Sequence, residues 1–212
     1  MEFSQMSRYR VPTRPSPAIL ALLIGSMVAS PALGRQRDYS VADRYALAAT
    51  LEDEETVDSL AKYLGGGKPS TVWDERVHFW VKNSSADEFK ARTIYRWIAD
   101  RISFRITIPS DPYGLHEYLA PDGRYWSRHS DPAYILKTRQ AFCSTYAVFY
   151  LALADKVNLH CRYMEGEVAV SSDNWFSHAW NVVEIEEKWR AVDSTWAAGY
   201  GSGDKFVKKF HD

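Results

Sequence analysis

The segment 144–157 constrains the fold of this chain most strongly, because apolar residues fill nearly every position in it. The segment has no glycine or proline, which predicts a helix buried on most of its sides. Cys143 lies at the expected N-terminus of this helix, where free backbone N–H groups and the helix dipole favour negative charge. A thiol in that position can ionise close to neutral pH, and the same N–H groups can stabilise an oxyanion.

Two β-prone segments, 178–185 and 188–193, follow the helix and are separated by two glutamates. If these two residues form the whole loop, the segments pair as a hairpin with Ile185 opposite Lys188. An odd-length loop would shift the register by one and turn the later side chains to the other face of the sheet. The sequence therefore predicts an even-length turn at this point.

An even turn places a histidine and an aspartate on the same face of the hairpin. Continued through the second segment, the pairing puts His178 opposite Thr195. Asp193 is then the diagonal neighbour of His178, roughly 7–8 Å away between backbones. At that separation the carboxylate can hold the imidazole in one tautomer. A thiol, an imidazole and a carboxylate arranged in this way are what nucleophilic cysteine catalysis requires.

The order of these motifs resembles the transglutaminase-like superfamily of papain-type cysteine enzymes. The resemblance rests on the cysteine, on His-Ala-Trp-Asn at 178–181, and on a Lys-Trp hairpin that ends in Val-Asp-Ser-Thr-Trp at 192–196. The segment 91–104 is similar to the helix before the catalytic core in the kyphoscoliosis-peptidase-like branch, and the whole resemblance covers about residues 40–210. It implies an α+β fold with a papain-like core, in which the nucleophile begins a buried helix packed on an antiparallel sheet.

The resemblance also implies a role for each of the three residues. Cys143 would be the nucleophile, His178 the general base and acid, and Asp193 the residue that orients the histidine. The family usually has glycines two residues before and two residues after the nucleophile, where this chain has Ala141 and Thr145. Two functions therefore stay open. One is a peptidase, amidase or transamidase that works through an acyl-enzyme, and the other is a degenerate domain that binds peptide or protein segments without cleaving them.

The second cysteine, Cys161, offers a competing interpretation, because a disulfide with Cys143 would abolish nucleophilicity. Residues 160–164 instead indicate a strand in which Cys161 is a small core residue. His160 would point to the opposite face of that strand, and no HExxH or paired CxxC spacing is present. We expect no metal site and no cofactor.

The first 34 residues have the pattern of a secretory signal peptide. Three arginines precede a 12-residue apolar stretch at 18–29, and small residues follow, with cleavage expected after Ala32 or Gly34. The chain is therefore predicted to be exported, to the periplasm or outside the cell, without stable membrane insertion after cleavage. The alternative is an uncleaved segment that tethers the chain to a membrane.

Net charge argues against one class of partner. Residues 1–34 hold three of the 26 basic and one of the 27 acidic side chains, which leaves 23 and 26, a net charge of −3. A nearly neutral, mixed surface gives no electrostatic footprint for nucleic acid. We therefore expect a protein or peptide substrate, and export brings cell-wall peptides into consideration.

Turn signals divide the rest of the chain into an N-terminal helical segment, 35–85, and a transglutaminase-like catalytic core, 86–212. Within the first, short helices are expected at 40–51 and 55–64, the second ended by three glycines.

The segment 109–132 is long, contains glycine and proline, and is rich in tyrosine, histidine and tryptophan. A loop of that length is often functional, so we interpret it as a wall or lid of a substrate cleft. Trp126 and His129 from this loop, with Trp180 beside the histidine, are the predicted substrate-binding residues. The alternative is a surface loop packed by its own aromatic side chains.

Overall fold

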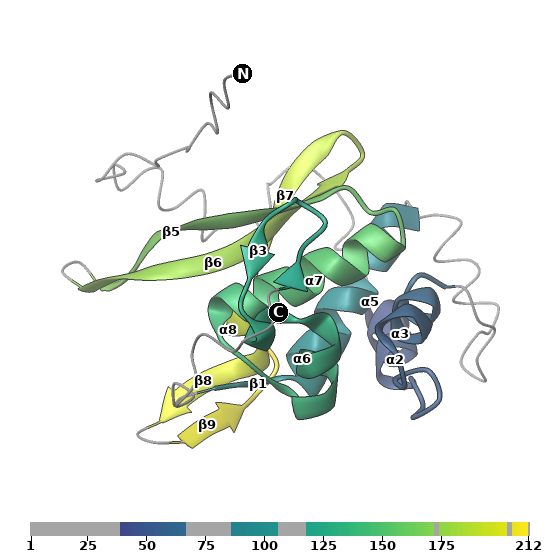
Figure 1. Cartoon of the computed structure of the whole chain (residues 1–212), viewed down its shortest axis with the longest axis horizontal. Helices are drawn as coiled ribbons and strands as arrows, with labels where there is room; N and C mark the ends of the chain where they lie inside the picture. Colours follow the sequence, from purple (N-terminus) through teal and green to yellow (C-terminus); the bar gives the residue numbers. More distant parts are fainter. Residues whose placement is uncertain (1–38, 67–85, 106–117, 172–173, 203–204, 212) are drawn as a thin grey trace.

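The computed structural model describes residues 39–66, 86–105, 118–171, 174–202 and 205–211. The long helix α7 (Cys143–Lys156) runs through the middle of the molecule (Figure 1). A three-stranded antiparallel sheet packs against it, and two of the more N-terminal helices pack against it as well. This is the predicted α+β arrangement of a buried helix on an antiparallel sheet, with the cysteine as the first residue of the helix.

The sheet consists of β5 (Cys161–Ser171), β6 (Asn174–Ile185) and β7 (Lys188–Val192), in that order. Ile185 pairs with Lys188, which confirms the predicted even-length turn. The two turn residues, Glu186 and Glu187, have φ angles of 53° and 61°. Positive φ at both positions is the geometry of a type I′ hairpin turn, whose twist matches that of the strands it joins.

The predicted continuation of this ladder to Thr195 is wrong. Pairing ends at Val192, and a short helix, α8 (Ser194–Ala198), begins two residues later. Asp193 caps this helix, because its Oδ1 accepts hydrogen bonds from the backbone N–H groups of Thr195 and Trp196. The cap satisfies N–H groups that the start of a helix leaves unpaired, so the chain leaves the sheet at this residue.

Three helices precede α7 in the chain: α2 (Ser40–Leu47), α3 (Val57–Leu64) and α5 (Ala86–Arg101). The first two confirm the helices expected at 40–51 and 55–64, although each is shorter than expected. Helix α3 begins after Thr56, whose Oγ1 accepts a hydrogen bond from the Ser59 N–H at 3.0 Å. Large side chains from these helices and from α7 form one continuous core, which includes Tyr45, Leu60, Tyr63, Phe89, Trp97 and Phe149.

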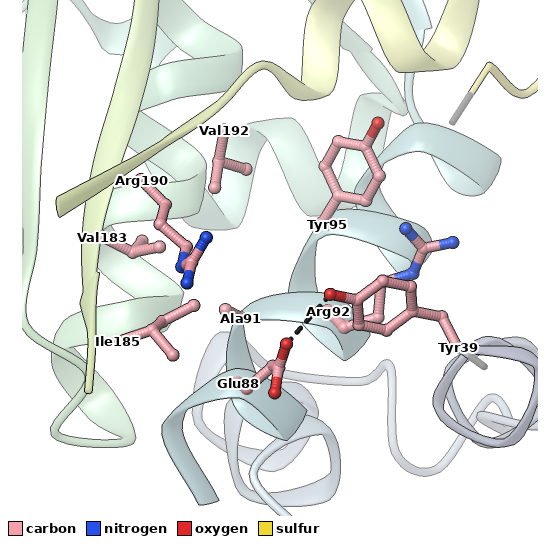
Figure 2. Close-up of a pocket in the computed structure, with 9 residues that line it drawn as sticks. All are labelled: Tyr39, Glu88, Ala91, Arg92, Tyr95, Val183, Ile185, Arg190 and Val192. Carbon is pink, nitrogen blue, oxygen red and sulfur yellow. Dashed lines mark hydrogen bonds between the residues drawn. The ribbon is translucent and has the colours of Figure 1, made fainter. Parts of the chain in front are cut away.

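Polar contacts hold the start of α2 against α5 (Figure 2). Asp43 accepts two hydrogen bonds from the Arg92 guanidinium, at 2.6 and 2.7 Å. The Tyr39 hydroxyl donates to the Glu88 carboxylate at 2.9 Å. Figure 2 shows that Tyr39, Glu88 and Arg92 line a pocket between α5 and the strands β6 and β7, to which Arg190 also contributes. The pocket is separate from the predicted site, since none of the residues that line it was predicted to be catalytic or substrate-binding.

The described part of the 109–132 loop, from residue 118 onward, contains short regular elements. These are the hairpin strands β2 (Tyr118–Leu119) and β3 (Tyr125–Trp126), followed by the 3-10 turn η1 (Arg128–Ser130). A helix that was not predicted, α6 (Pro132–Thr138), follows directly. Its start is fixed by proline in the first turn and by Asp131, whose carboxylate accepts a hydrogen bond from the Ala133 N–H at 2.8 Å.

Two further strand pairs complete the described fold. Strands β1 (Ser103–Phe104) and β4 (Gln140–Ala141) pair in parallel and bring the chain to the start of α7. Strands β8 (Gly199–Ser202) and β9 (Lys205–Lys208) form an antiparallel hairpin. The Lys208 ammonium donates to the Ala99 carbonyl at 2.8 Å, which ties this hairpin to the C-terminal end of α5.

The predicted signal peptide, residues 1–34, lies outside the described residues, as does part of the 35–85 segment. Within the part of the chain that the structure describes, no helix combines the length and apolar character needed to cross a membrane.

Candidate active site

Hydrogen bonds fix the backbone that leads into the half-buried thiol of Cys143. The N–H of Phe142 donates to Thr145 Oγ1 at 2.6 Å, and this hydroxyl donates back to the Phe142 carbonyl at 3.0 Å. One residue earlier, the Ala141 carbonyl accepts a hydrogen bond from the Arg105 N–H at 2.9 Å. The chain therefore enters α7 along a defined path, and the position of the thiol is set by the backbone.

The pKa of Cys143 is lower than that of an ordinary cysteine. Burial by itself raises it, but a hydrogen bond from His178 and the positive charge of that ring lower it by more. The backbone N–H groups of Ala179 and Ser144 also stabilise the thiolate. Ser144 supplies the contribution expected from the start of a helix, and it is the smallest of these.

His178 is held between the thiol and a carboxylate. Its Nε2 lies 2.6 Å from Asp193 Oδ2, which leaves Nδ1 as the ring nitrogen for Cys143. Burial alone would lower the pKa of His178, but its hydrogen bonds to Asp193 and Cys143 and the charges of both groups raise it to about 9. The opposite shifts of cysteine and histidine favour the thiolate–imidazolium form of the pair.

The carboxylate of Asp193 is itself fixed in orientation. While Oδ2 faces His178, Oδ1 accepts the N–H groups of Thr195 and Trp196 at 3.0 and 3.2 Å. The same cap that ends the sheet pairing therefore aims the carboxylate at the imidazole. Three residues after His178 on β6, the amide of the buried Asn181 donates to the Ala147 carbonyl at 3.0 Å and joins this strand to α7.

Three aromatic rings surround the imidazole of His178. The Trp196 and Trp180 rings lie nearly parallel to it, at centroid distances of 5.2 and 6.2 Å, and the Phe176 ring meets it edge-on at 5.9 Å. His178 is only 4% exposed, whereas Phe176 and Trp196 are 38% and 39% exposed. The buried imidazole is thus bordered by aromatic surface that faces solvent, as expected beside a site that receives a substrate.

The sequence profile of the transglutaminase-like superfamily matches residues 73–194, more than half of the chain. The chain belongs to this superfamily. Human kyphoscoliosis peptidase is 26% identical over 175 residues, which cover 79% of this chain and 24% of that protein. Hillarin of Drosophila melanogaster is 23% identical over 169 residues, 76% of this chain and 17% of that protein.

The chain thus spans about a quarter or less of the length of these curated relatives. Among solved structures, the periplasmic domain of TgpA from Pseudomonas aeruginosa is similar, with 15% sequence identity and a TM-score of 0.40. The similarity covers 76% of this chain and 49% of that one.

Two departures from the usual superfamily pattern have structural explanations in this chain. Thr145, in place of a glycine, uses its hydroxyl to bond both the N–H and the carbonyl of Phe142. Ala141, in place of the other glycine, is 2% exposed and lies within the hydrophobic core. Both side chains therefore stabilise the entry to α7, and neither requires the backbone conformations that only glycine adopts.

The predicted substrate-binding residues of this superfamily member lie at different places. Trp180 borders the imidazole, as described above. Trp126 packs against Tyr163 at a ring distance of 4.9 Å, and Tyr163 lies close enough to Cys143 to sense its charge. His129 lies in η1 with its ring 5.3 Å from that of Tyr134, within its own segment of the chain. Their binding of substrate stays a prediction.

Trp196 is a site residue that sequence reasoning missed. A signal for it was present, because it lies three residues after Asp193, the distance that places it in the first turn of a helix capped by that aspartate. Extending the strand pairing of segment 188–193 as far as Thr195 hid this signal.

Cys161 and Cys143 are both free thiols. Burial raises the pKa of Cys161 to about 12, so this thiol stays protonated at neutral pH. Among the described residues, no group of three or more histidine, cysteine, aspartate or glutamate side chains is placed to hold a metal ion.

Proposed function

We propose that this chain is an exported transglutaminase-like cysteine enzyme, a peptidase, amidase or transamidase, that acts through Cys143, His178 and Asp193. One observation carries the proposal. The hydrogen bond of 2.6 Å between His178 and Asp193 joins a chain of contacts that lowers the pKa of Cys143 and raises that of His178. A non-catalytic binding domain has no need of a stabilised thiolate.

The chemistry follows from these contacts. The thiolate of Cys143 attacks the carbon of a carboxamide or peptide carbonyl, a C–S bond forms, and the carbonyl electron pair moves to oxygen. Backbone N–H groups at the start of α7 are the candidate donors to this oxyanion. When the tetrahedral intermediate collapses, the C–N bond breaks and the imidazolium of His178 transfers its proton to the leaving amine.

The acyl-enzyme is then released by a second nucleophile. The now neutral imidazole of His178 takes a proton from the acceptor as it attacks the thioester, and the thiolate of Cys143 leaves. Water as acceptor gives a carboxylic acid, the outcome for a peptidase or amidase, and an amine gives a new amide, the outcome for a transamidase. Asp193 keeps the imidazole in the tautomer and orientation that both steps require.

The first test is the pH dependence of alkylation of Cys143 by iodoacetamide, followed by mass spectrometry at each cysteine. Fast labelling well below pH 8 is expected, because the thiolate is already formed there. Slow labelling with an ordinary cysteine pKa would contradict the proposal and favour the peptide-binding alternative.

A second test identifies the acceptor. Glutamine-containing protein and cell-wall peptides are offered with and without a fluorescent primary amine, using Cys143→Ala as the inactive control. Incorporation of the amine indicates a transamidase, and release of ammonia or new termini without incorporation indicates an amidase or peptidase. Products equal to those of the Cys143→Ala control throughout would contradict an enzymatic function.

Export is part of the proposal and rests on the basic, apolar and small-residue pattern of residues 8–34. The mass of the protein recovered from its producing cells tests this. A mature N-terminus at Leu33 or Arg35 is expected, whereas an intact Met1 on cell-associated protein would support a membrane tether instead.

A further inference from the structure

Glu54, in the turn between α2 and α3, is a buried carboxylate that the proposed chemistry does not use. It is 7% exposed. It also precedes residues 73–194, the part of the chain that the superfamily profile matches. A charged group in such a position is stable only if it is paired and hydrogen-bonded. The partners of Glu54 therefore show what the N-terminal helical segment contributes to the rest of the chain.

Three partners from two later segments converge on this carboxylate. Its Oε1 accepts a hydrogen bond from the indole N–H of Trp97 at 3.1 Å and lies 3.6 Å from the Arg101 guanidinium, both from α5. Its Oε2 accepts a hydrogen bond from the Arg139 guanidinium at 2.8 Å. The same guanidinium lies over the Trp97 ring, 5.0 Å from its centroid. The side chain of Arg139 is thus held by charge on one side and by an aromatic face on the other.

Arg139, four residues before the proposed nucleophile, has an unusual backbone conformation. Its φ of 57° is in the left-handed region, which a residue with a side chain rarely adopts, and this conformation ends α6. Its carbonyl accepts a hydrogen bond from the Ser103 N–H at 2.9 Å, and strand β4 starts at the next residue. The direction in which the chain enters α7 is therefore decided at Arg139.

We propose that Glu54 is a positioning residue for the nucleophile: by fixing Arg139, it sets the turn from which the chain reaches Cys143. The N-terminal helical segment would then help to position the proposed nucleophile, although Glu54 lies outside the region matched to the superfamily. The inference rests on the proposed function, in which Cys143 is the nucleophile. Glu54 is not one of the proposed catalytic residues. It acts on Cys143 through Arg139, while its contacts with Trp97 and Arg101 hold it against α5.

The test compares two partly buried ion pairs that hold the N-terminal helical segment against later parts of the chain. Glu54→Ala and the milder Glu54→Gln remove the contact with Arg139. Asp43→Ala removes the contact with Arg92, which joins α2 to α5 without touching the turn at Arg139. Arg139→Lys keeps the positive charge and loses the fork and the stacking on Trp97. Each protein is measured for urea unfolding and for the rate of iodoacetamide alkylation at Cys143 as a function of pH.

If Glu54 positions the nucleophile, Glu54→Ala shifts the alkylation profile to higher pH and lowers the rate at pH 6.5 by about threefold to tenfold, since one pKa unit is about tenfold in thiolate. Glu54→Gln and Arg139→Lys show smaller shifts in the same direction. Asp43→Ala loses stability but keeps the wild-type profile. An unchanged profile in the folded Glu54 variants, or an equal shift in Asp43→Ala, would overturn the inference.

Amide hydrogen exchange supplies a readout that does not depend on thiol chemistry. The N–H groups of Ser103, Arg105 and Phe142 donate to the segment around Arg139 and Cys143, so their exchange reports on the path into α7. Faster exchange at these three amides in Glu54→Gln, and not in Asp43→Ala, supports the inference, and equal exchange in the two variants overturns it. An ordinary thiol pKa in the wild type would defeat the proposed function, while the exchange result would still decide the role of Glu54.

Discussion

One cysteine of this chain begins helix α7 and the other follows that helix, and their environments differ in one decisive respect. Burial raises the pKa of both thiols. At Cys161 the Asn181 amide and a backbone group offset little of this, and the pKa rises to about 12. At Cys143 the hydrogen bond and charge of His178, together with the N–H groups of Ala179 and Ser144, outweigh burial and lower the pKa. The comparison indicates that the imidazole, more than the helix N-terminus, distinguishes the thiol whose pKa is lowered from the thiol whose pKa is raised.

Among the substitutions considered, His178→Ala is expected to have the largest effect on the difference in reactivity between Cys143 and Cys161. Without the imidazole, burial leaves the pKa of Cys143 at or above that of an ordinary cysteine, so alkylation at pH 6.5 falls by about a hundredfold. Labelling of Cys161, measured in the same spectra, serves as the internal reference and stays slow. A rate at Cys143 that hardly changes would mean that the helix start alone stabilises the thiolate.

A smaller effect, about tenfold on the alkylation rate, is expected from Asp193→Asn, which removes the charge that supports the imidazolium. The variant also has a signature in stability. The raised pKa of His178, about 9 against an ordinary 6.5, stabilises the fold fully below pH 6.5, and this contribution is lost as the pH rises through 9.

Urea unfolding of wild type and Asp193→Asn should therefore differ more at pH 6 than at pH 9.5. The asparagine Oδ1 can still accept the two N–H groups at the start of α8, so the cap is largely kept and contributes little to the difference at either pH. A difference in unfolding free energy that is independent of pH would show that the carboxylate does not support the imidazolium of His178.

Replacement of Trp196 by alanine is expected to lower the alkylation rate of Cys143 by a few-fold. Trp196→Ala removes a stacked ring that supports the imidazolium and lets water weaken the hydrogen bond to Asp193. We expect these losses to exceed the effect of reduced burial, and therefore to lower the pKa of His178. Trp196→Phe keeps an aromatic ring over His178 and should retain most of the alkylation rate. The matched pair of pH profiles measures this, and identical profiles for the two variants would exclude a role for the stacked ring.

The smallest effect on reactivity is expected from Cys161→Ala. The substitution removes a thiol packed against the hydrophobic core and should cost about 1 kcal/mol of unfolding free energy. The alkylation profile of Cys143 should stay as in the wild type. A change in that profile would mean that the two thiols communicate, which their separate environments do not suggest.

Sequence patterns predicted the parts of the fold that depend on local rules. The helix after Cys143 follows from an uninterrupted apolar segment, and the register of β6 and β7 follows from two residues between two β-prone segments. The approach of His178 to Asp193 also followed from that register, although the path beyond Val192 was predicted incorrectly. A short helix cap overrode β propensity there, because a single aspartate satisfied several backbone N–H groups.

Contacts between distant segments could not be predicted in this way. Acidic residues such as those at 52–55 are typical of a solvated helix start, yet Glu54 is buried and accepts a hydrogen bond from Arg139, 85 residues later. Similarly, glycines such as those after Trp196 are typical of loops, whereas pairing with residues 205–208 forms a hairpin. In both cases the deciding partner lies outside any sequence window in which propensity or periodicity is informative.

The two-glutamate turn between β6 and β7 makes the effect of an insertion or deletion depend on whether its length is odd or even. Because side chains alternate along a strand, adding or removing one residue in this turn would direct Asp193 to the opposite face of the sheet. A change of two residues would keep Asp193 on the same face as His178. Length variation among natural or engineered versions of this hairpin should therefore come in even steps wherever the chemistry survives. Odd steps would mark copies that have kept the fold and lost the site.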